Sequence, residues 1–383
     1  SDPLIVLFLG GFLIARAIAS SGLHRRIAVR LIGLAGNRPP RVLAAVMLAT
    51  AFLSLWISNT ASAMVLAPIA AAIAASQEDH PKFGTALMLG VAFAATIGGL
   101  GSLIGTPPNA IFAAHVRETY GAEVGFAEWA AVGIPVSFLL LTIAWVFLAR
   151  VSPCVEDRSL ELDLGTDNGE MGPAERRVAL VAGLTALGWL SRPILEWLFP
   201  AVPISDAGIG ILAGVSLFLL PDGQDGRLLD WKTASNLRWD VLLLFGGGLA
   251  LAGILQDTGL ARSIGGLVQE TAHLPELVLL FLFAALIVYV GELASNTAMA
   301  AIFLPIAGAV ALSLDIDPVT FLFPITLAAS IGFMLPVATP PNAIVFADPA
   351  VTRRNMLHAG APLEVIGLVV TVGAGYLRAP VVF

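Results

Sequence analysis

Long apolar runs alternate with short polar segments along the whole chain. The runs lie near residues 3–19, 42–75, 85–113, 129–151, 177–199, 206–220, 240–256, 277–312, 319–347 and 361–378. A helix needs about 20 apolar residues to cross the hydrocarbon core of a bilayer, and many of the runs reach or approach that length. The pattern therefore predicts an all-α polytopic membrane protein.

Four of these runs contain a break in an otherwise apolar sequence. Runs 42–75 and 277–312 are too long for one span, and each carries Ser-Asn-Thr near its middle. Runs 85–113 and 319–347 each contain Thr-Pro-Pro-Asn, and the first of these follows a glycine-rich segment, 98–105, that we expect to be flexible. Ser, Thr and Asn are favoured at helix N-caps, and proline fits the first helical turn. The breaks predict two re-entrant hairpins and two interrupted helices.

An internal repeat relates the breaks to one another. SNTASAMVLAPIA at 58–70 recurs as SNTAMAAIFLPIA at 295–307, 237 residues later, and TPPNAI at 106–111 recurs at 339–344 after a shift of four residues in that offset. The polar, acidic segment 152–176 separates the two halves. A lone Ser-Asn-Thr or a lone proline kink in a span is usually a packing element, but the paired copies favour a shared function.

Loop charges give the orientation of the repeats. Segment 23–41 carries five arginines and no acid, which marks it as cytoplasmic. Loop 115–128 carries three glutamates and one arginine, which suits the opposite side. Segment 8–27 recurs at 245–264, and the five runs expected to cross between the two copies invert the second one. Inverted repeats with paired broken helices are typical of secondary transporters.

The second repeat has two apolar runs, 177–199 and 206–220, in front of its copy of segment 8–27. The first repeat has no such runs before Phe8. We therefore expect further helices before residue 1 in the natural protein.

Composition narrows the classes of function. The 383 residues are 57% hydrophobic and 12% charged, with a mean hydropathy of +0.89, whereas soluble domains carry about 25% charged residues. The net charge of −7 offers no basic stripe for a nucleic acid. The single cysteine, Cys154, excludes an internal disulfide, and the five histidines lack metal-ligand spacing. The sequence has no nucleophile–base constellation and no phosphate-binding loop, so we expect neither an enzyme nor an organic cofactor.

The chemistry of the four breaks suits an anion and a cation together. Each break begins a half-helix whose free N–H groups and dipole favour an anion. Four such ends near the midplane would hold a small dianion without Lys or Arg. The carbonyl groups that end the preceding half-helices suit a small hard cation. Co-binding neutralises both charges, which gives a physical reason for coupled transport.

Glu292 is the main candidate for a buried acid, because it lies in an apolar run three residues before Ser295. Two roles are open: a hydrogen bond to the hairpin tip, and the carrying of a proton. The first repeat has Leu55 at the equivalent position, so symmetry does not indicate a duplicated role.

The sequence resembles the divalent-anion/sodium symporter family. The resemblance rests on the two SNT triplets, the two TPPN breaks, FLGGF near the start and FMLPVATPPNAIVFA at 333–347, and it covers essentially the whole chain. Members of this family carry dicarboxylates, citrate and, in some branches, sulfate. The resemblance implies a homodimer that works as an elevator, in which a transport domain containing both hairpins slides against a scaffold.

On this sequence the resemblance implies alternating scaffold and transport parts. They are 1–41 (scaffold helix and cytoplasmic basic arm), 42–151 (transport domain, first repeat), 152–176 (polar linker), 177–273 (scaffold helices) and 274–383 (transport domain, second repeat). The expected location is the bacterial inner membrane, with several spans. The expected partners are the lipid bilayer, sodium, a small dicarboxylate and a second copy of the chain, with no nucleic acid.

The resemblance also assigns residues to the ions and the substrate. The first sodium site would use Ser54, Ser58, Asn59 and Gly105. The second would use, largely through backbone oxygens, Gly291, Ala294, Asn296 and Ala338. Substrate carboxylates would meet Asn59, Thr60, Asn296, Thr297, Thr339 and Pro340, with Thr106 nearby. Many members have a hydroxyl residue where this chain has Gly291, which leaves the number of sodium ions open.

The expected function is sodium-coupled secondary transport of C4-dicarboxylates such as succinate, malate or fumarate. Within transport, the alternatives are a sodium-independent dicarboxylate exchanger and a citrate or sulfate carrier. An anion channel is the alternative from a different class, because it can use the same helix-terminus site.

Overall fold

The computed structural model describes residues 3–76, 81–151, 170–237 and 274–382, together with part of 238–259. Six helices in the described residues are long and apolar enough to cross a membrane, and shorter apolar helices of 10–17 residues accompany them. The prediction of an all-α fold with several apolar helices is confirmed.

The helices described before residue 238 mostly follow the apolar runs. In chain order they are α1 (Pro3–Ser20), α2 (Leu23–Gly33), α3 (Pro39–Ser54), α4 (Asn59–Ala75), α5 (Pro81–Leu100), α6 (Pro107–Tyr120), α7 (Phe126–Val151), α8 (Pro173–Leu198), α9 (Asp206–Leu219) and α10 (Trp231–Ala234). Helix α8 begins inside the predicted linker 152–176, because Pro173 starts the helix and the Glu175 side chain accepts a hydrogen bond from the Gly172 N–H at 2.9 Å. The linker residues 152–169 lie outside the described residues.

Five further helices lie within the described residues 274–382. They are α13 (Glu276–Gly291), α14 (Asn296–Ser313), α15 (Pro318–Ala329), α16 (Pro340–Phe346) and α17 (Arg353–Val382). Residues 260–273 and several positions between 238 and 257 lie outside the described residues. The predicted copy of segment 8–27 at 245–264 falls mostly there, and it stays a prediction.

Both predicted hairpins are broken at their Ser-Asn-Thr triplets. Helix α3 ends at Ser54 and α4 begins at Asn59, while α13 ends at Gly291 and α14 begins at Asn296. In each hairpin the two half-helices pack against each other.

Both predicted interruptions at Thr-Pro-Pro-Asn are also present, but they differ in length. Helix α5 ends at Leu100 and α6 begins at Pro107, which leaves six residues between them. Helix α15 ends at Ala329 and α16 begins at Pro340, which leaves ten. The second interruption therefore leaves more backbone groups without a helical partner.

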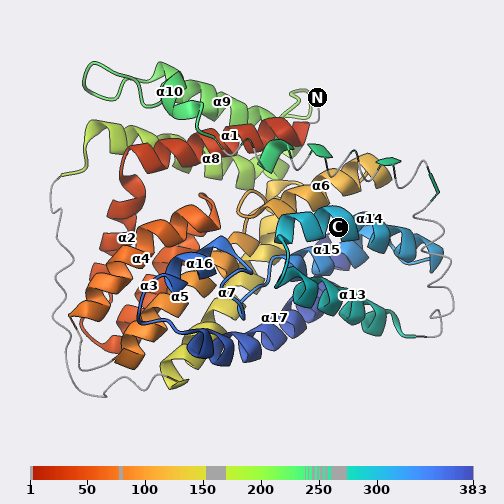
Figure 1. Ribbon diagram of the computed structural model, residues 1–383. Coiled ribbons are helices and arrows are strands. Elements are labelled where there is room, and N and C mark those ends of the chain that lie inside the picture. Colours follow the sequence, from red (N-terminus) through yellow and green to blue (C-terminus); the bar gives the residue numbers. More distant parts are fainter. Residues whose placement is uncertain are drawn as a thin grey trace.

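The two halves are interleaved in the main body of the molecule. Helix α16 packs against α4 and α5, α6 packs against α14 and α15, and α17 packs against α7. Helices α1, α8, α9 and α10 lie together along one edge, where α1 packs against α8 and α9 (Figure 1). The interleaving brings the four breaks together. The division into scaffold and transport domains remains a prediction.

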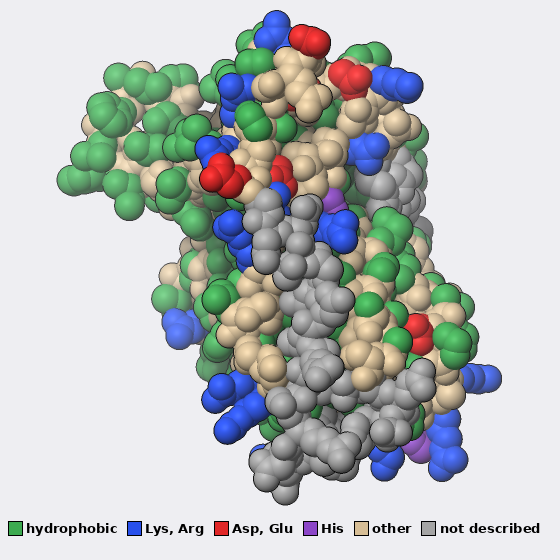
Figure 2. All heavy atoms as spheres, turned by 90° about the vertical axis from the view of Figure 1, so that its left-hand side faces the viewer, with side chains coloured by type: hydrophobic (Ala, Val, Ile, Leu, Met, Phe, Trp, Pro, Cys, Tyr) green, Lys and Arg blue, Asp and Glu red, His purple; other side chains and the backbone are tan. Residues whose placement is uncertain are grey.

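Helix α2 carries the basic segment that the sequence places on the cytoplasmic side. Lys and Arg side chains are spread over the face that includes α2, and a neighbouring lobe of that face is mainly hydrophobic (Figure 2). Arg26 on α2 forms an ion pair of 2.9 Å with Glu175 at the start of α8. This ion pair joins the basic segment to the edge layer, which is formed by α1, α8, α9 and α10.

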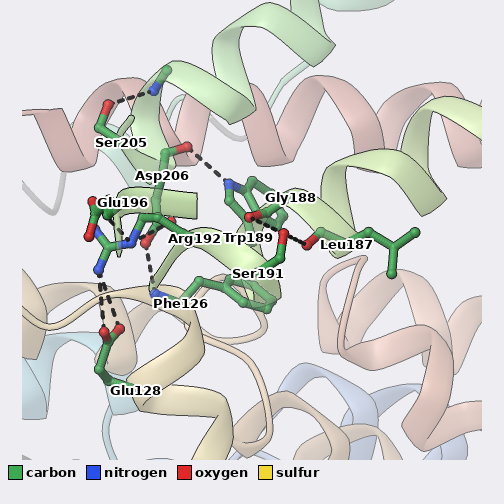
Figure 3. Close-up of polar contacts among 11 residues, drawn as sticks. Phe126, Glu128, Leu187, Gly188, Trp189, Ser191, Arg192, Glu196, Ser205 and Asp206 are labelled. Atoms are coloured by element: carbon green, nitrogen blue, oxygen red, sulfur yellow. Dashed lines mark hydrogen bonds and ion pairs between the residues drawn. The ribbon is translucent and has the colours of Figure 1, made fainter. Parts of the chain in front are cut away.

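A buried polar cluster joins the start of α7 to α8 and α9 (Figure 3). Arg192 on α8 lies 3.4 Å from a carboxylate oxygen of Glu128 on α7 and 3.4 Å from Oδ1 of Asp206 on α9. Asp206 Oδ2 accepts a hydrogen bond of 2.8 Å from the Phe126 N–H, and Trp189 Nε1 donates to the Asp206 carbonyl at 2.9 Å. Since an unpaired buried charge is strongly destabilising, these contacts fix α7 against the α8–α9 pair.

The crossing of α1 and α9 at two glycines gives a first testable prediction. A methyl group on Gly10 would lie 2.9 Å from Gly210 Cα, so Gly10→Val should push the two helices apart. We expect the melting temperature of the purified protein in detergent to fall by at least about 3 °C, as overpacked cores lose about 1–3 kcal/mol. Gly183→Val on α8 is the control, because no atom lies within 4 Å of a methyl group there. An equal loss in both variants would contradict the close crossing.

Candidate functional site

A cavity of about 500 Å³ lies where the four breaks meet. Both hairpin tips, both Thr-Pro-Pro segments and one face of α1 line it. Its volume falls within the range of about 300–1,000 Å³ that small-molecule sites occupy. Among the described residues, none of those lining the cavity carries a charge. Any attraction for an ion must therefore come from backbone and neutral polar groups.

Four helices begin at this cavity, as the sequence predicts. Their first residues that line it are Asn59 and Thr60 of α4, Pro107 of α6, Asn296 and Thr297 of α14, and Pro340 and Pro341 of α16. Helices α4, α6 and α14 have 14–18 residues, whereas α16 has seven and contributes a weaker dipole. The positive ends of four helices thus face one uncharged space.

The caps of the four helices are unequal. Ser58 Oγ accepts a hydrogen bond from the Ala61 N–H, and Thr339 Oγ1 accepts one from the Asn342 N–H, each at 3.3 Å. The side chains of Ser295 and Thr106 make no such capping bond. Pro107 and Pro108 have no N–H, and the Asn109 N–H donates to the Thr106 carbonyl at 3.2 Å. The first turn of α14, which begins Asn296-Thr297, therefore keeps donors that a bound anion can satisfy.

Oxygen atoms gather around Asn59 in the first hairpin. The inward-facing terminal atom of its amide lies 2.7 Å from Ser54 Oγ and 3.2 Å from the carbonyl oxygens of Ala95 and Gly105. As a nitrogen, this atom donates to its neighbours. As an oxygen, it completes a group of four oxygens of the kind that binds a hard cation. Ser54 is buried behind the cavity wall and also donates to the Ala95 carbonyl at 2.6 Å.

Asn296 occupies the equivalent place in the second hairpin. Its Nδ2 donates to the Ser330 carbonyl at 3.3 Å, while its Oδ1 is buried and has no hydrogen-bond partner among the described residues. A methyl group on Gly291 would lie 3.5 Å from this oxygen. Ala294 and Ala338 line the adjacent cavity wall. A buried acceptor without a donor calls for an explanation, and a cation at this point would provide one.

Two asparagines that sequence reasoning did not assign hold the interrupted helices. Asn109 Nδ2 donates to the carbonyls of Gly99 and Ser102, at 3.1 and 2.8 Å. Asn342 Nδ2 donates to the carbonyls of Gly332 and Leu335, at 3.1 and 2.9 Å. The two patterns are related by the same offset as the two TPPN motifs, so the asparagine of that motif was a visible signal. These side chains close the carbonyl ends of both breaks.

The glycines of segment 98–105 serve close packing. A methyl group on Gly98 would lie 2.6 Å from Ala51 Cα on α3, and one on Gly99 would lie 3.1 Å from Asn59 Nδ2. All residues of the segment except Ile104 are buried. These glycines have a steric role, because only glycine lets α5 approach the first hairpin so closely, and the expectation of flexibility stays a prediction.

Glu292 bonds to a different segment from the one that the sequence suggested. Its two carboxylate oxygens accept hydrogen bonds from the N–H groups of Met334, at 3.1 Å, and Leu335, at 2.7 Å. These donors lie in the interruption between α15 and α16, and the carboxylate is buried with the side chain 2% exposed. Together with the bond from Asn296 to the Ser330 carbonyl, these contacts join the hairpin tip to the second interrupted helix.

Aromatic and small residues from outside the breaks complete the cavity wall. Phe8, Gly11, Phe12 and Ala15 of α1 form one side of it, and Trp56 at the first hairpin tip forms another. Trp56 lies near the Phe126 ring, with centroids 6.2 Å apart, and Phe126 stacks on Trp189 at 4.8 Å. The ring stack leads from the cavity to the polar cluster of Figure 3. The FLGGF motif at 8–12 contains three residues of the α1 wall, but it did not mark them as cavity residues, because their contact with the breaks depends on tertiary packing.

The structure brings nearly all the predicted site residues to one place. Eleven line the cavity: Ser58, Asn59, Thr60, Gly105, Thr106, Ala294, Asn296, Thr297, Ala338, Thr339 and Pro340. Ser54 and Gly291 do not line it and lie behind Asn59 and Asn296, as described above. The roles of these thirteen residues in binding ions and substrate belong to the proposed function.

The chain shares extensive similarity with known transporters. It is 35% identical over 400 residues to the sodium-dependent dicarboxylate transporter SdcS of Staphylococcus saprophyticus subsp. saprophyticus, covering 99% of this chain and 77% of that protein. It is 34% identical over 405 residues to the protein of the same name from Staphylococcus aureus (strain USA300), covering 100% of this chain and 77% of that one.

A solved structure supports the fold. The structure of the Alcanivorax borkumensis YdaH transporter matches 98% of this chain and 83% of its own chain, with a TM-score of 0.65 and 15% identity. At that identity the likeness concerns the fold alone. The family described as "Sodium:sulfate symporter transmembrane region" matches residues 1–383. The expectation that the chain is not an enzyme is confirmed, and the chain belongs to the sodium:sulfate symporter family as a multi-pass transporter of the plasma membrane.

Proposed function

We propose that the protein carries C4-dicarboxylates such as succinate, malate or fumarate together with sodium ions, by an elevator mechanism. The observation that carries this proposal is the uncharged cavity at which four helices begin, flanked by an asparagine of each hairpin. The relatives that are named sodium-dependent dicarboxylate transporters support the choice of anion and ion.

The cavity suits a dianion whose carboxylates are held by N–H and hydroxyl groups. Each helix start contributes roughly half a positive charge, so four starts are comparable with the charge of a dicarboxylate. Thr60 and Thr297 lie at the first turns of α4 and α14 and line the cavity. In this proposal their hydroxyls, with the amides of Asn59 and Asn296, bind the carboxylates. The rings of Phe8 and Phe12 cover the hydrocarbon part of the substrate.

Sodium ions take the oxygen-rich positions behind each hairpin tip. The first ion is held by Ser54, Asn59 and the carbonyl oxygens near Ala95 and Gly105, which already surround one amide atom. The second is held near Asn296 Oδ1, whose buried oxygen lacks a donor among the described residues. Each ion would neutralise part of the anion charge a few ångströms away, so neither ligand binds well without the other.

The elevator step follows from the different walls of the cavity. The four breaks belong to the interleaved body, whereas Phe8, Gly11, Phe12 and Ala15 belong to α1 in the edge layer. A body that moves past α1 would carry the loaded cavity across the membrane. Small side chains at Gly11 and Ala15 reduce interdigitation along that surface.

Substrate uptake into proteoliposomes tests the function. With sodium outside, we expect succinate, malate and fumarate to accumulate several-fold, about 5-fold or more over a potassium control, and citrate and sulfate to compete weakly. Uptake that ignores sodium but speeds up when vesicles are preloaded with succinate would instead establish an exchanger. Unitary currents without saturable uptake would establish a channel.

Hydroxyl removal tests the substrate contacts. Thr60→Ala and Thr297→Ala each delete one hydrogen bond to a charged group, worth about 1.5–3 kcal/mol. We expect the KM for succinate to rise about 10-fold or more in each variant, while purified protein melts as the wild type does. The control is Thr142→Ala on α7, whose hydroxyl donates to the Phe138 carbonyl of its own helix. Wild-type KM values in both cavity variants would refute these contacts.

A charge at the first hairpin tests the arrangement of anion and cation. Asn59→Asp places a negative charge beside the proposed carboxylate and within the proposed sodium site. At about 4 Å, two like charges repel by about 4 kcal/mol at an effective dielectric constant of about 20. We expect succinate KM to rise by at least about 10-fold, while the sodium concentration for half-maximal uptake does not rise. Loss of sodium affinity with unchanged succinate KM would contradict the proposed placement.

A further inference from the structure

A second carboxyl group is buried beside the interruption between α15 and α16. Glu364 on α17 is 0% exposed, and its Oε2 accepts a hydrogen bond of 2.7 Å from the Phe333 N–H. Its Oε1 has no hydrogen-bond donor among the described residues. The neighbouring N–H groups of Met334 and Leu335 donate to Glu292. Two carboxyl groups from different helices thus hold three successive backbone amides.

The length of this interruption explains why the amides need acceptors. Segment 330–339 is unwound over ten residues, so the amides of residues 333–335 have no helical partner. Backbone groups at membrane depth must be satisfied within the protein. In the first repeat, Leu100 is still part of α5, and the Gly101 N–H donates to the Gly98 carbonyl. Two of the three equivalent amides thus have partners without an acid, which is consistent with Leu55 at the position of Glu292.

Two glycines of α17 allow Glu364 to reach this segment. A methyl group on Gly360, one turn earlier, would lie 2.9 Å from Met334 Cα, and one on Gly367 would lie 3.0 Å from Ile331 Cδ1. Residues four and three apart share one face of a helix. Glycine on either side of Glu364 therefore lets the helix backbone approach the segment so closely that the carboxyl group reaches the Phe333 N–H.

The segment that Glu364 holds ends in residues of the cavity. Ala338 and Thr339 follow within six residues of Phe333 and line the cavity wall. The Asn342 side chain also binds this segment, by donating hydrogen bonds to the carbonyls of Gly332 and Leu335. The carbonyl groups of the segment are thus bound by two amide side chains, Asn342 and, at Ser330, Asn296, and its N–H groups by two carboxyl groups. Removal of Glu364 would free one end of the segment without touching the cavity.

We propose that Glu364 is a positioning residue, which together with Glu292 holds segment 330–339 in the conformation that presents Ala338 and Thr339 to the cavity. It contacts neither substrate nor ion. The expected effect of Glu364 on transport rests on the proposed function. The order of segment 330–339, however, can be measured without a transport assay.

Two substitutions separate positioning from a role of the charge. Glu364→Gln removes the ionisable group but keeps an oxygen at the same reach, so the Phe333 N–H keeps its acceptor. Glu364→Asp keeps an ionisable carboxyl group but is shorter by one methylene group, so the hydrogen bond is lost. Positioning predicts a normal Gln variant and an impaired Asp variant, whereas a role that depends on the charge predicts the reverse order. Thr371→Val is the control, because this buried hydroxyl of α17 donates only to carbonyls of its own helix, Gly367 and Leu368.

Hydrogen–deuterium exchange of the purified full chain is the first measurement. In Glu364→Asp, we expect the amides of a peptide covering 330–339 to exchange about 10-fold faster or more, while peptides from α5 and α6 are unchanged. Glu364→Gln and Thr371→Val should exchange as the wild type does. Equal exchange in the wild type and the Asp variant would overturn the proposal, whatever the transport assay shows.

Sodium-driven succinate uptake is the second measurement. In Glu364→Asp, we expect the sodium concentration for half-maximal uptake to rise about 5-fold or more, with the maximal rate at saturating sodium and succinate changed less than about 2-fold. Asp-variant kinetics equal to the wild type, or a Gln variant more impaired than the Asp variant, would overturn the proposal. Absence of uptake in the wild type would refute the proposed function instead, and the exchange experiment would still decide the role of Glu364.

Discussion

The structure depends on one constraint: every backbone polar group that a broken helix exposes inside a bilayer must find a partner within the protein. Four breaks meet in this chain, and side chains form hydrogen bonds with backbone groups that the breaks expose. Asn109 and Asn342 take carbonyls, and Glu292 and Glu364 take N–H groups. The groups that face the cavity are the ones left for a ligand. In the proposed function, the binding site is thus formed by backbone groups that side chains leave unpaired.

The sequence was sufficient to predict the breaks and their meeting place, because both rest on local chemistry and on duplication. Ser-Asn-Thr and Thr-Pro-Pro-Asn end and restart helices wherever they stand. Their repetition in two halves makes a common site the simplest arrangement. Asn59 and Asn296 therefore fall at equivalent places of the structure, as do Asn109 and Asn342.

Other parts could not be predicted, because they depend on where distant segments pack. The interruption after α15 is longer than the one after α5, although the same motif ends both. The role of Glu364 depends on the packing of α17 against that interruption. The hydrogen bond between Glu292 and Leu335 likewise joins residues that are 43 positions apart in the sequence. The cluster of Arg192, Glu128 and Asp206 likewise joins three helices. In the sequence, asymmetry between the repeats was visible in the exchange of Leu55 for Glu292, in the glycine-rich segment 98–105 before the first TPPN motif, and in the four-residue shift between the two motifs.

The ring stack of Trp56, Phe126 and Trp189 has a consequence for motion. It connects the first hairpin tip to α8 through two ring contacts, of which the nearer has its centroids 4.8 Å apart. Aromatic pairs contribute only about 0.5–1.5 kcal/mol each beyond the area that they bury. In the proposed elevator movement, a displacement of the first hairpin tip relative to α8 would separate at least one of these ring pairs and would also expose area that the rings bury. The stack would then be a contact that the protein breaks and forms again each time it transports.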